Sequence, residues 1–300
     1  MDRVKIKKEL VSYIYIIPSV IFMFFFVMIP IILSIVMSFF RMESLSSEWI
    51  YVGFENFALA FRNSDFLWSL GRTLVFGAFS VVSSLFFGLL IALLVSHHKM
   101  LNFYRYIFYL PSVVSAITMG RLYGLMLMPS NTGVLNSILN AIGFINEPVN
   151  WLGNGTVTFW TVICLGFIGC GGGMTLLLFS TAINNIPEEL NEAARLEGAS
   201  GAVLAVRITI PMISNVLTSW LILSLIGAFK SFEFIYALTG GGPVHATTTI
   251  AILLYESSKT SSAGYGYSAA MGLILTLIVS VVTFVYMYFS NFNKSSDIES

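Results

Sequence analysis

A polar segment, residues 184–211, interrupts this otherwise apolar chain and reads NNIPEELNEAARLEGASGAVLAVRITIP. Its carboxylates and guanidinium groups could form charged contacts with a soluble partner. Asn184 and Asn185 suit a helix cap, and Pro187 suits a first helical turn. Glu188 and Glu189 then place negative charge at the positive end of the helix dipole. The segment therefore predicts an exposed helix that starts near residue 187.

The same segment predicts a second helix behind a glycine joint. The residues that give the first helix a small apolar face are Leu190, Ala193 and Ala194. Gly198 can end that helix because glycine accepts a left-handed backbone, and a second helix then fits Ser200 to about Ile208. Pro211 marks the return to apolar sequence. Two short helices joined at a glycine would make a compact projection.

The order of residues in this segment resembles a signature of the inner-membrane permease subunits of bacterial ABC importers. The signature runs E-A-A, three residues, G, nine residues, I, one residue, L-P. The matching positions are held by Glu192, Ala193, Ala194, Gly198 and Ile208, and Ile210 with Pro211 replaces the final Leu-Pro. The resemblance implies the all-α, type I importer permease fold with six transmembrane helices. The alternative is an amphipathic helix that merely lies on the membrane.

The resemblance also implies what the segment contacts. Glu192 would make a charged contact with a separate cytosolic ATPase, Ala193 and Ala194 would let the backbones approach, and Gly198 would set the angle between the helices. Ile208 and Pro211 would complete the docking loop. The implied assembly contains a second homologous permease, two cytosolic ATP-binding subunits and an extracytoplasmic solute-binding protein. ATP and Mg²⁺ would bind the ATPases, and this chain would need no cofactor.

Composition places the chain in a lipid bilayer. Of its 300 residues 57% are hydrophobic and only 10% are charged, whereas a soluble globular domain carries about 25% charged residues. The formal net charge is zero, so nucleic acid is not indicated as a partner. Cys164 and Cys170 lie in an apolar stretch, where we expect buried thiols and no metal site.

Apolar stretches separated by polar loops predict six membrane helices in one permease domain, residues 11–300, after a basic N-terminus, residues 1–10. The expected helices cover about 11–40, 70–96, 106–128, 157–182, 212–238 and 267–289. Lysine and arginine concentrate in the N-terminus, the link near Lys99, the polar segment and the tail. Because such residues favour the cytoplasmic side, we expect both termini and the polar segment in the cytoplasm of a bacterial cell.

Catalytic and ATP-binding motifs are missing from the sequence. No G-x-x-x-x-G-K-[ST] loop occurs, so the chain has no phosphate cradle of that kind. The histidines His97, His98 and His245 lie apart from any nucleophile or metal-ligand set. We therefore expect a transport subunit that is driven by another chain and is not itself an enzyme.

A glycine-rich run, GFIGCGGGMT at residues 166–175, is the first place where cargo could pass. Gly166, Gly169 and Gly173 are spaced to let a second helix approach closely. The other interpretation is a locally unwound wall beside a translocation path, in which Gly171, Gly172 and Gly173 would face the cargo. Both interpretations are kept open.

The end of the expected fifth helix, KSFEFIYALTGGGP at residues 230–243, is the second candidate. Lys230 and Glu233 could pair on one helix face and lower the free-energy cost of placing charge in the membrane. They could also line the substrate path together with Tyr236, since sugars stack on aromatic rings. Tyrosines equally form belts at membrane interfaces.

The same run resembles the F-D-x-I-Y-x-x-T-x-G-G-P element of carbohydrate importers. This resemblance implies an outer loop that meets the binding protein, with Thr239, Gly241, Gly242 and Pro243 as contact residues. Two further elements are similar to family patterns: YVGFENFALAF at residues 51–61 and GYGYSAAMG at residues 264–272.

These observations favour a permease subunit of an ATP-driven importer for a sugar or oligosaccharide, most similar to maltose, lactose and glycerol-phosphate permeases. A permease of this class for a non-sugar solute is one alternative. An ion-coupled secondary transporter is another, although the polar segment and the absence of an obvious inverted repeat count against it. A receptor or assembly protein without transport activity is the third.

Overall fold

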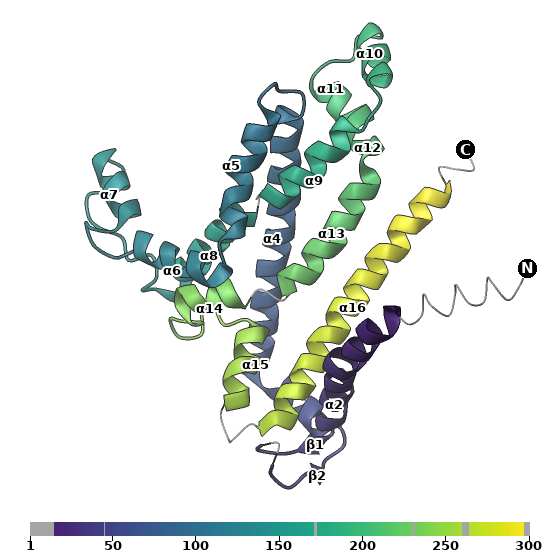
Figure 1. The fold of residues 1–300 in the computed structure, drawn as a ribbon. Helices are drawn as coiled ribbons and strands as arrows, with labels where there is room; N and C mark the ends of the chain where they lie inside the picture. Colours follow the sequence, from purple (N-terminus) through teal and green to yellow (C-terminus); the bar gives the residue numbers. More distant parts are fainter. Residues whose placement is uncertain (1–14, 45, 171–172, 230–231, 260–263, 297–300) are drawn as a thin grey trace, which may run out of the picture. The chain divides into compact units, whose positions relative to one another are not determined.

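The computed structural model describes residues 15–44, 46–170, 173–229, 232–259 and 264–296. It divides the chain into two compact units, residues 1–67 with 253–277 and residues 68–252 with 278–300, where the sequence predicted one domain. The unit boundaries fall near the start of α4 (Ser64–Val95), in α15 (Ile250–Lys259) and in α16 (Gly264–Ser296). Figure 1 shows that helices make up most of the described chain.

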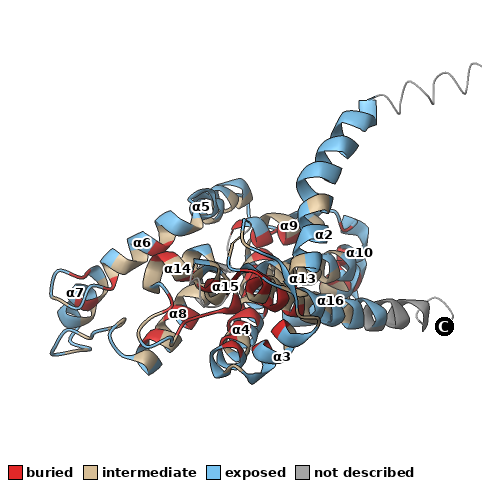
Figure 2. Cartoon of the chain, turned by 90° about the horizontal axis from the view of Figure 1, so that it is seen from below, coloured by how far each residue is buried: buried red, intermediate tan, exposed pale blue. Residues whose placement is uncertain are grey.

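The first unit opens with an apolar helix, Tyr15–Met37, that is long enough to cross a membrane. A wide π-helical turn, η1 (Phe24–Met28), precedes α2 (Ile29–Met37). Pro30 has no backbone N–H, and this irregular turn stands directly before the missing donor. No residue in its most apolar window is buried in the described chain, and Figure 2 shows this helix exposed along most of its length. Its apolar surface therefore needs lipid or another chain.

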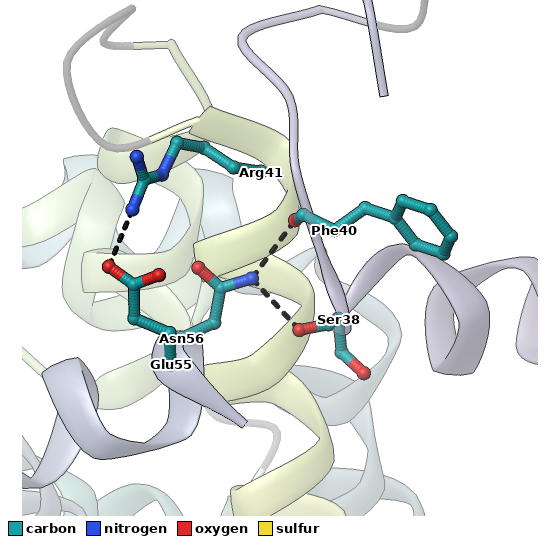
Figure 3. Close-up of polar contacts among 5 residues, drawn as sticks. All are labelled: Ser38, Phe40, Arg41, Glu55 and Asn56. Atoms are coloured by element: carbon teal, nitrogen blue, oxygen red, sulfur yellow. Dashed lines mark hydrogen bonds and ion pairs between the residues drawn. The ribbon is translucent and has the colours of Figure 1, made fainter. Parts of the chain in front are cut away.

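A short hairpin follows this helix and is tied back to its end. Strands β1 (Phe40–Arg41) and β2 (Ile50–Tyr51) pair antiparallel, and α3 (Glu55–Arg62) comes next. The buried amide of Asn56 donates to the carbonyl oxygens of Ser38 and Phe40, each at 2.9 Å (Figure 3). Asn56 thus satisfies carbonyls that the helix end leaves free. Arg41 and Glu55 form an ion pair on the surface (Figure 3).

The start of α16 packs on the same hairpin. A Cβ on Gly266 would lie within 3.0 Å of the Phe40 carbonyl oxygen, so only glycine allows this approach. The Tyr265 amide donates to the Met42 carbonyl oxygen at 2.9 Å. The elements at residues 51–61 and 264–272, about 200 residues apart in the sequence, therefore meet around Phe40–Met42.

Several helices are shorter than the sequence predicted. Three described helices are long and apolar enough to span a membrane: Tyr15–Met37, Ser64–Val95 and Gly264–Tyr288. A bent pair, Ala202–Met212 with Ser214–Ala228, would make a fourth. The remaining expected spans are interrupted: 106–128 divides into α5 (Leu101–Val113) and α6 (Ala116–Met126), and 157–182 contains α8 (Gly155–Cys170) and α9 (Gly173–Asn184). The stretch 212–238 starts where α12 (Ile210–Met212) ends and is divided into α13 (Ser214–Phe229) and α14 (Glu233–Thr239). A further short helix, α7 (Val134–Ala141), lies in the loop at 129–156.

The break between α5 and α6 has a local cause. Ser115 adopts an extended backbone and its hydroxyl accepts a hydrogen bond from the Thr118 amide at 3.3 Å, which caps α6. Pro111 lies in the last turn of α5 and cannot donate a backbone bond there. A single helix over residues 106–128 was therefore the wrong prediction.

Three helices of the second unit are joined by buried polar contacts. The Trp220 indole Nε1 on α13 donates to Ser84 Oγ on α4 at 3.0 Å, and Ser84 Oγ lies 3.2 Å from Thr175 Oγ1 on α9. Gly88 makes room for Thr175, because a Cβ at residue 88 would collide with it. We call Trp220, Ser84 and Thr175 the interhelical brace. Cys164, expected to be buried, is exposed on the surface of the described chain.

Candidate functional site

The polar loop, residues 184–211, begins with α10 (Glu188–Leu196). Asn184 is still the last residue of α9, and Pro187 occupies the N-cap position without a side-chain cap bond. The prediction that Asn184 and Asn185 cap α10 was therefore wrong. Glu188 and Glu189 do lie in its first turn, where the helix dipole favours negative charge.

Gly198 ends α10 through a left-handed backbone conformation and two backbone hydrogen bonds. It has φ of +89°, its amide donates to the Arg195 carbonyl oxygen at 3.0 Å, and the Ala199 amide donates to the Ala194 carbonyl oxygen at 2.9 Å. These two bonds form a Schellman motif, which satisfies the last carbonyls of the helix. A Cβ on Gly198 would touch nothing within 4 Å, so backbone conformation alone requires glycine here.

The exposed face of α10 differs from the predicted one. Glu192 and Ala193 are exposed, but Ala194 is only 6% exposed and turns into the chain beside Asn191. Leu190, Ala193 and Ala194 therefore do not form one small-residue face. Sequence reasoning missed Leu196, which is 90% exposed and follows Glu192 by one helical turn. Its large apolar side chain in a polar loop was the available signal.

The second half of the polar loop is longer than expected. After Gly201, with φ of +52°, a continuous helical stretch runs through α11 (Ala202–Leu204), η2 (Ala205–Thr209) and α12 to Met212. The prediction ended this helix near Ile208, which is half-buried. Exposed Pro211 does not stop it: Pro211 has no backbone N–H, and the wide π turn η2 stands directly before it in the helix. The chain then bends by 73° into α13.

Both ends of the polar loop are held in one apolar core. Ile186 before α10 and Ile213 after α12 are buried in the same cluster, which includes Phe179 of α9. Figure 1 shows α9 and α13 leading into and out of this loop. The interhelical brace joins both helices to α4, and Arg105 of α5 donates to Ser180 and Thr181 of α9 at 2.9 and 3.1 Å. The loop therefore projects from a well-packed base.

A second candidate, the glycine turn at residues 239–249, uses its motif residues internally. The Thr239 hydroxyl lies 2.7 Å from Thr247 Oγ1, accepts from the Gly241 amide at 3.2 Å and lies 3.0 Å from the Ile235 carbonyl oxygen. Gly241 is buried with φ of +89°, and a Cβ there would lie 2.7 Å from Thr248 Oγ1. These residues build the turn. Their contact with a binding protein stays a prediction.

What the glycine turn exposes is a pair of residues that the sequence analysis did not predict as contact residues. Val244 is 94% exposed with φ of +47°, and His245 is exposed with φ of +58°. A positive φ on a β-branched residue is strained. Gly242 and Pro243 are half-buried behind this tip. The tip of the turn is therefore Val244 with His245.

One family matches most of the chain, residues 84–293, and its description is binding-protein-dependent transport system inner membrane component. The chain belongs to this family. The matched range includes the polar loop, the glycine turn and the interhelical brace. The chain is therefore an inner-membrane component of a transport system and carries several membrane helices.

Relatives match the inner membrane component over nearly its full length. A probable ABC transporter permease protein, YurN of Bacillus subtilis, is 30% identical over 291 residues, which cover 96% of this chain and 98% of the relative. The trehalose/maltose transport system permease protein MalF of Thermococcus litoralis is 31% identical over 294 residues, 98% of each chain. A solved bacterial ABC transporter involved in the import of the acidic polysaccharide alginate has a chain of the same fold, with a TM-score of 0.81, 24% identity and coverage of 96% and 97%.

The residues predicted for a substrate path are only partly brought together in this inner membrane component. Lys230, Gly171 and Gly172 lie outside the described residues, so the Lys230–Glu233 pair stays a prediction. Glu233 is exposed at the start of α14, and Tyr236 is half-buried with its ring 4.9 Å from that of Phe232.

Gly173 has a packing role. A Cβ there would collide with the backbone of α5 at Tyr109, so glycine allows α9 and α5 to touch. Gly166, by contrast, has open space around it. The close-packing interpretation therefore holds for Gly173, whereas no atom of the described chain packs on Gly166. Within the described residues, no group of three or more His, Cys, Asp or Glu side chains could hold a metal ion.

Proposed function

We propose that this inner membrane component is the permease subunit of an ATP-driven importer for sugars or oligosaccharides, and that it forms half of the translocation pore. Several relatives support the substrate class by name, including permease proteins for trehalose and maltose, arabinooligosaccharides and lactose. The near-complete coverage of these relatives supports transfer of the whole subunit's role. A second homologous permease would supply the other half of the pore.

The polar loop is the proposed docking site for a separate cytosolic ATPase. The observation that carries this proposal is the exposed face of α10, where Glu192, Ala193 and Leu196 project from a loop whose two ends are fixed in the apolar core. A soluble motor can shift a transporter between two conformations only if it binds them differently, and a firmly held loop passes that difference to the helices. Glu192 would give a charged contact and Leu196 an apolar anchor.

The remaining partners follow from the same proposal. Two ATP-binding subunits would hold ATP and Mg²⁺, since this chain lacks the usual phosphate-binding loop. An extracytoplasmic binding protein would deliver the sugar; a solved relative of the same fold is described in complex with an alginate pentasaccharide-bound periplasmic protein. Both termini and the polar loop would be cytoplasmic, as the distribution of basic residues favours.

The test is Glu192→Lys in the reconstituted complex. We expect ATPase subunits to co-purify poorly and ATP-driven sugar uptake to fall at least about tenfold, because a lost charged contact of about 1.5–3 kcal/mol corresponds to that factor or more. Glu147→Lys makes the same charge change on an exposed residue outside the polar loop and should leave ATPase binding unchanged. Normal ATPase binding and uptake in Glu192→Lys would refute the docking assignment. Uptake driven by an ion gradient without ATP would instead identify a secondary transporter.

A further inference from the structure

Six aromatic side chains gather where the first helix ends, and we call them the aromatic hairpin: Phe39, Phe40, Trp49, Tyr51, Phe54 and Phe57. Phe40 packs against Trp49 and Tyr51, with ring centroids 5.6 and 5.4 Å apart. Phe39 packs against Phe54 and Phe57 at 5.3 and 5.5 Å. All six belong to the first compact unit. The function proposed above uses none of them.

The aromatic hairpin is not a core. Tyr51 is 71% exposed, Phe54 is 72% exposed and Trp49 is 38% exposed. Ile50, between two of the rings in sequence, is 54% exposed. Contiguous exposed apolar surface of this kind is unfavourable in water and marks a contact with lipid or protein.

The position of the hairpin along the chain indicates which contact it makes. The helix Tyr15–Met37 has 23 residues and therefore a length of about 35 Å, slightly more than the roughly 30 Å of bilayer hydrocarbon. The residues just after Met37 must then lie at a membrane surface. Asn56 and the Val52 amide, which donates to the Phe39 carbonyl oxygen at 2.9 Å, hold the hairpin against the helix end. It cannot extend away into water.

The side chains of the hairpin suit that depth. Tryptophan and tyrosine favour the headgroup layer because an apolar ring and a polar atom are satisfied there together. The charged groups beside the rings also fit: Arg41 and Glu55 neutralise each other as an ion pair, and Glu43 and Glu48 are exposed. Charges of this density are excluded from hydrocarbon but not from headgroups.

We propose that the aromatic hairpin is a lipid-binding surface that inserts into the headgroup layer and fixes the depth of the first helix in the bilayer. Phospholipid, and not a protein partner, is its occupant. The two ring pairs on Phe40 place Trp49 and Tyr51 on one side of β2, so both rings enter the layer together. Asn56 and Gly266 keep this surface rigid, because they fix the Phe40 backbone from two sides.

The test measures tryptophan quenching by brominated phospholipids. The assembled transporter is reconstituted in vesicles whose lipids carry bromine either high on the acyl chain, near the headgroup, or at the chain end. Trp49→Phe removes the fluorescence of Trp49 from the total. We expect the fluorescence removed in this way to be quenched more strongly by the shallow bromine than by the deep one. Tyr51→Trp should add a second signal with the same preference. Glu147→Trp, at an exposed position outside both the aromatic hairpin and the polar loop, should add a signal that neither lipid quenches.

Two results would overturn the proposal. Trp49 and Tyr51→Trp could be quenched by neither lipid or more strongly by the deep bromine, which places the hairpin in water or in hydrocarbon. Quenching could also appear in the isolated chain and vanish in the assembled complex, which would assign the surface to a partner protein. Neither result bears on ATPase docking, which the co-purification of Glu192→Lys tests separately.

Discussion

The polar loop and the glycine turn both match sequence elements of importer permeases, yet they use their matching residues in opposite ways. In the polar loop, Glu192 and Ala193 are exposed on α10. In the glycine turn, Thr239 and Gly241 face inward and hold the backbone, and the exposed tip is Val244 with His245. One match marks residues that can contact a partner, whereas the other marks a scaffold.

The difference shows how to interpret such matches. Glu192 is exposed on α10, so its carboxylate is available to a partner outside the chain. A threonine with three internal contacts or a glycine with a positive φ is already explained by the fold. Substitutions at the two sites should therefore have different effects. Variants of the polar loop should lose partner binding at unchanged stability, whereas variants of the glycine turn should first lose stability.

Gly198→Pro should have the largest effect and tests the Schellman motif at the end of α10. Proline fixes φ near −65° and cannot adopt the +89° of Gly198, so the Schellman motif must open. We expect uptake to fall to background and the ATPase subunits to be lost during purification, while the chain still inserts into the membrane. Gly166→Ala, at a glycine with open space around it, is the matched control and should behave as the unmodified protein. Full uptake in Gly198→Pro would mean that the loop geometry is not needed.

Gly241→Ala tests the opposite behaviour at the glycine turn. The left-handed backbone costs an alanine about 1–2 kcal/mol, and its Cβ would lie 2.7 Å from Thr248 Oγ1. We expect the thermal midpoint in detergent to fall clearly and uptake to fall in proportion to the loss of folded protein. ATPase subunits should still co-purify with the folded fraction. If uptake is lost while the thermal midpoint is unchanged, Gly241 is a contact residue and its role is not structural.

Val244→Gly separates strain from contact at the tip of the turn. Removing the side chain relieves about 1–2 kcal/mol of left-handed strain and adds about 0.4–1 kcal/mol of unfolded-state entropy, so stability should rise by about 0.5 kcal/mol. If the tip touches the proposed binding protein, stimulation of transport by that protein should fall at the same time. A change of both quantities in opposite directions would show that the fold holds Val244 in strain for a contact. Unchanged stimulation would leave the turn as scaffold alone.

A structural feature could be predicted from the sequence when the residues that cause it lie close to it in the chain. The start of α10, the left-handed Gly198 and the long helices near 70–96 and 267–289 follow from nearby residues, and the sequence predicted them. The break at Ser115 was also local, but a long apolar stretch outweighed a single capping serine. The inward orientation of Ala194 was not predictable, because it depends on which face of α10 the rest of the unit covers.

Asn56 makes long-range contacts that the sequence did not predict. Its motif was visible as YVGFENFALAF, but its partners are carbonyl groups 16 and 18 residues earlier, exposed by the end of a membrane helix. Likewise, the match at residues 264–272 gave no sign that Gly266 rests on Phe40. Contacts between distant backbones carry no periodicity, and so the first compact unit could not be derived from the sequence.

Trp220→Phe should have the smallest effect and tests how the polar loop is supported from behind. The substitution keeps an aromatic ring against Phe179 but removes the indole N–H that donates to Ser84. Ser84 still contacts Thr175, so no buried group is left entirely without a partner, and an interhelical bond in a membrane bundle contributes about 0.6 kcal/mol on average. We expect a small fall in thermal midpoint, normal ATPase binding and slightly reduced uptake for each ATP hydrolysed. The helices α9 and α13 lead into and out of the polar loop. A large fall in uptake per ATP without loss of stability would therefore show that the brace transmits movement between the loop and the helices. Unchanged uptake per ATP and unchanged stability would show that the brace only packs the helices together.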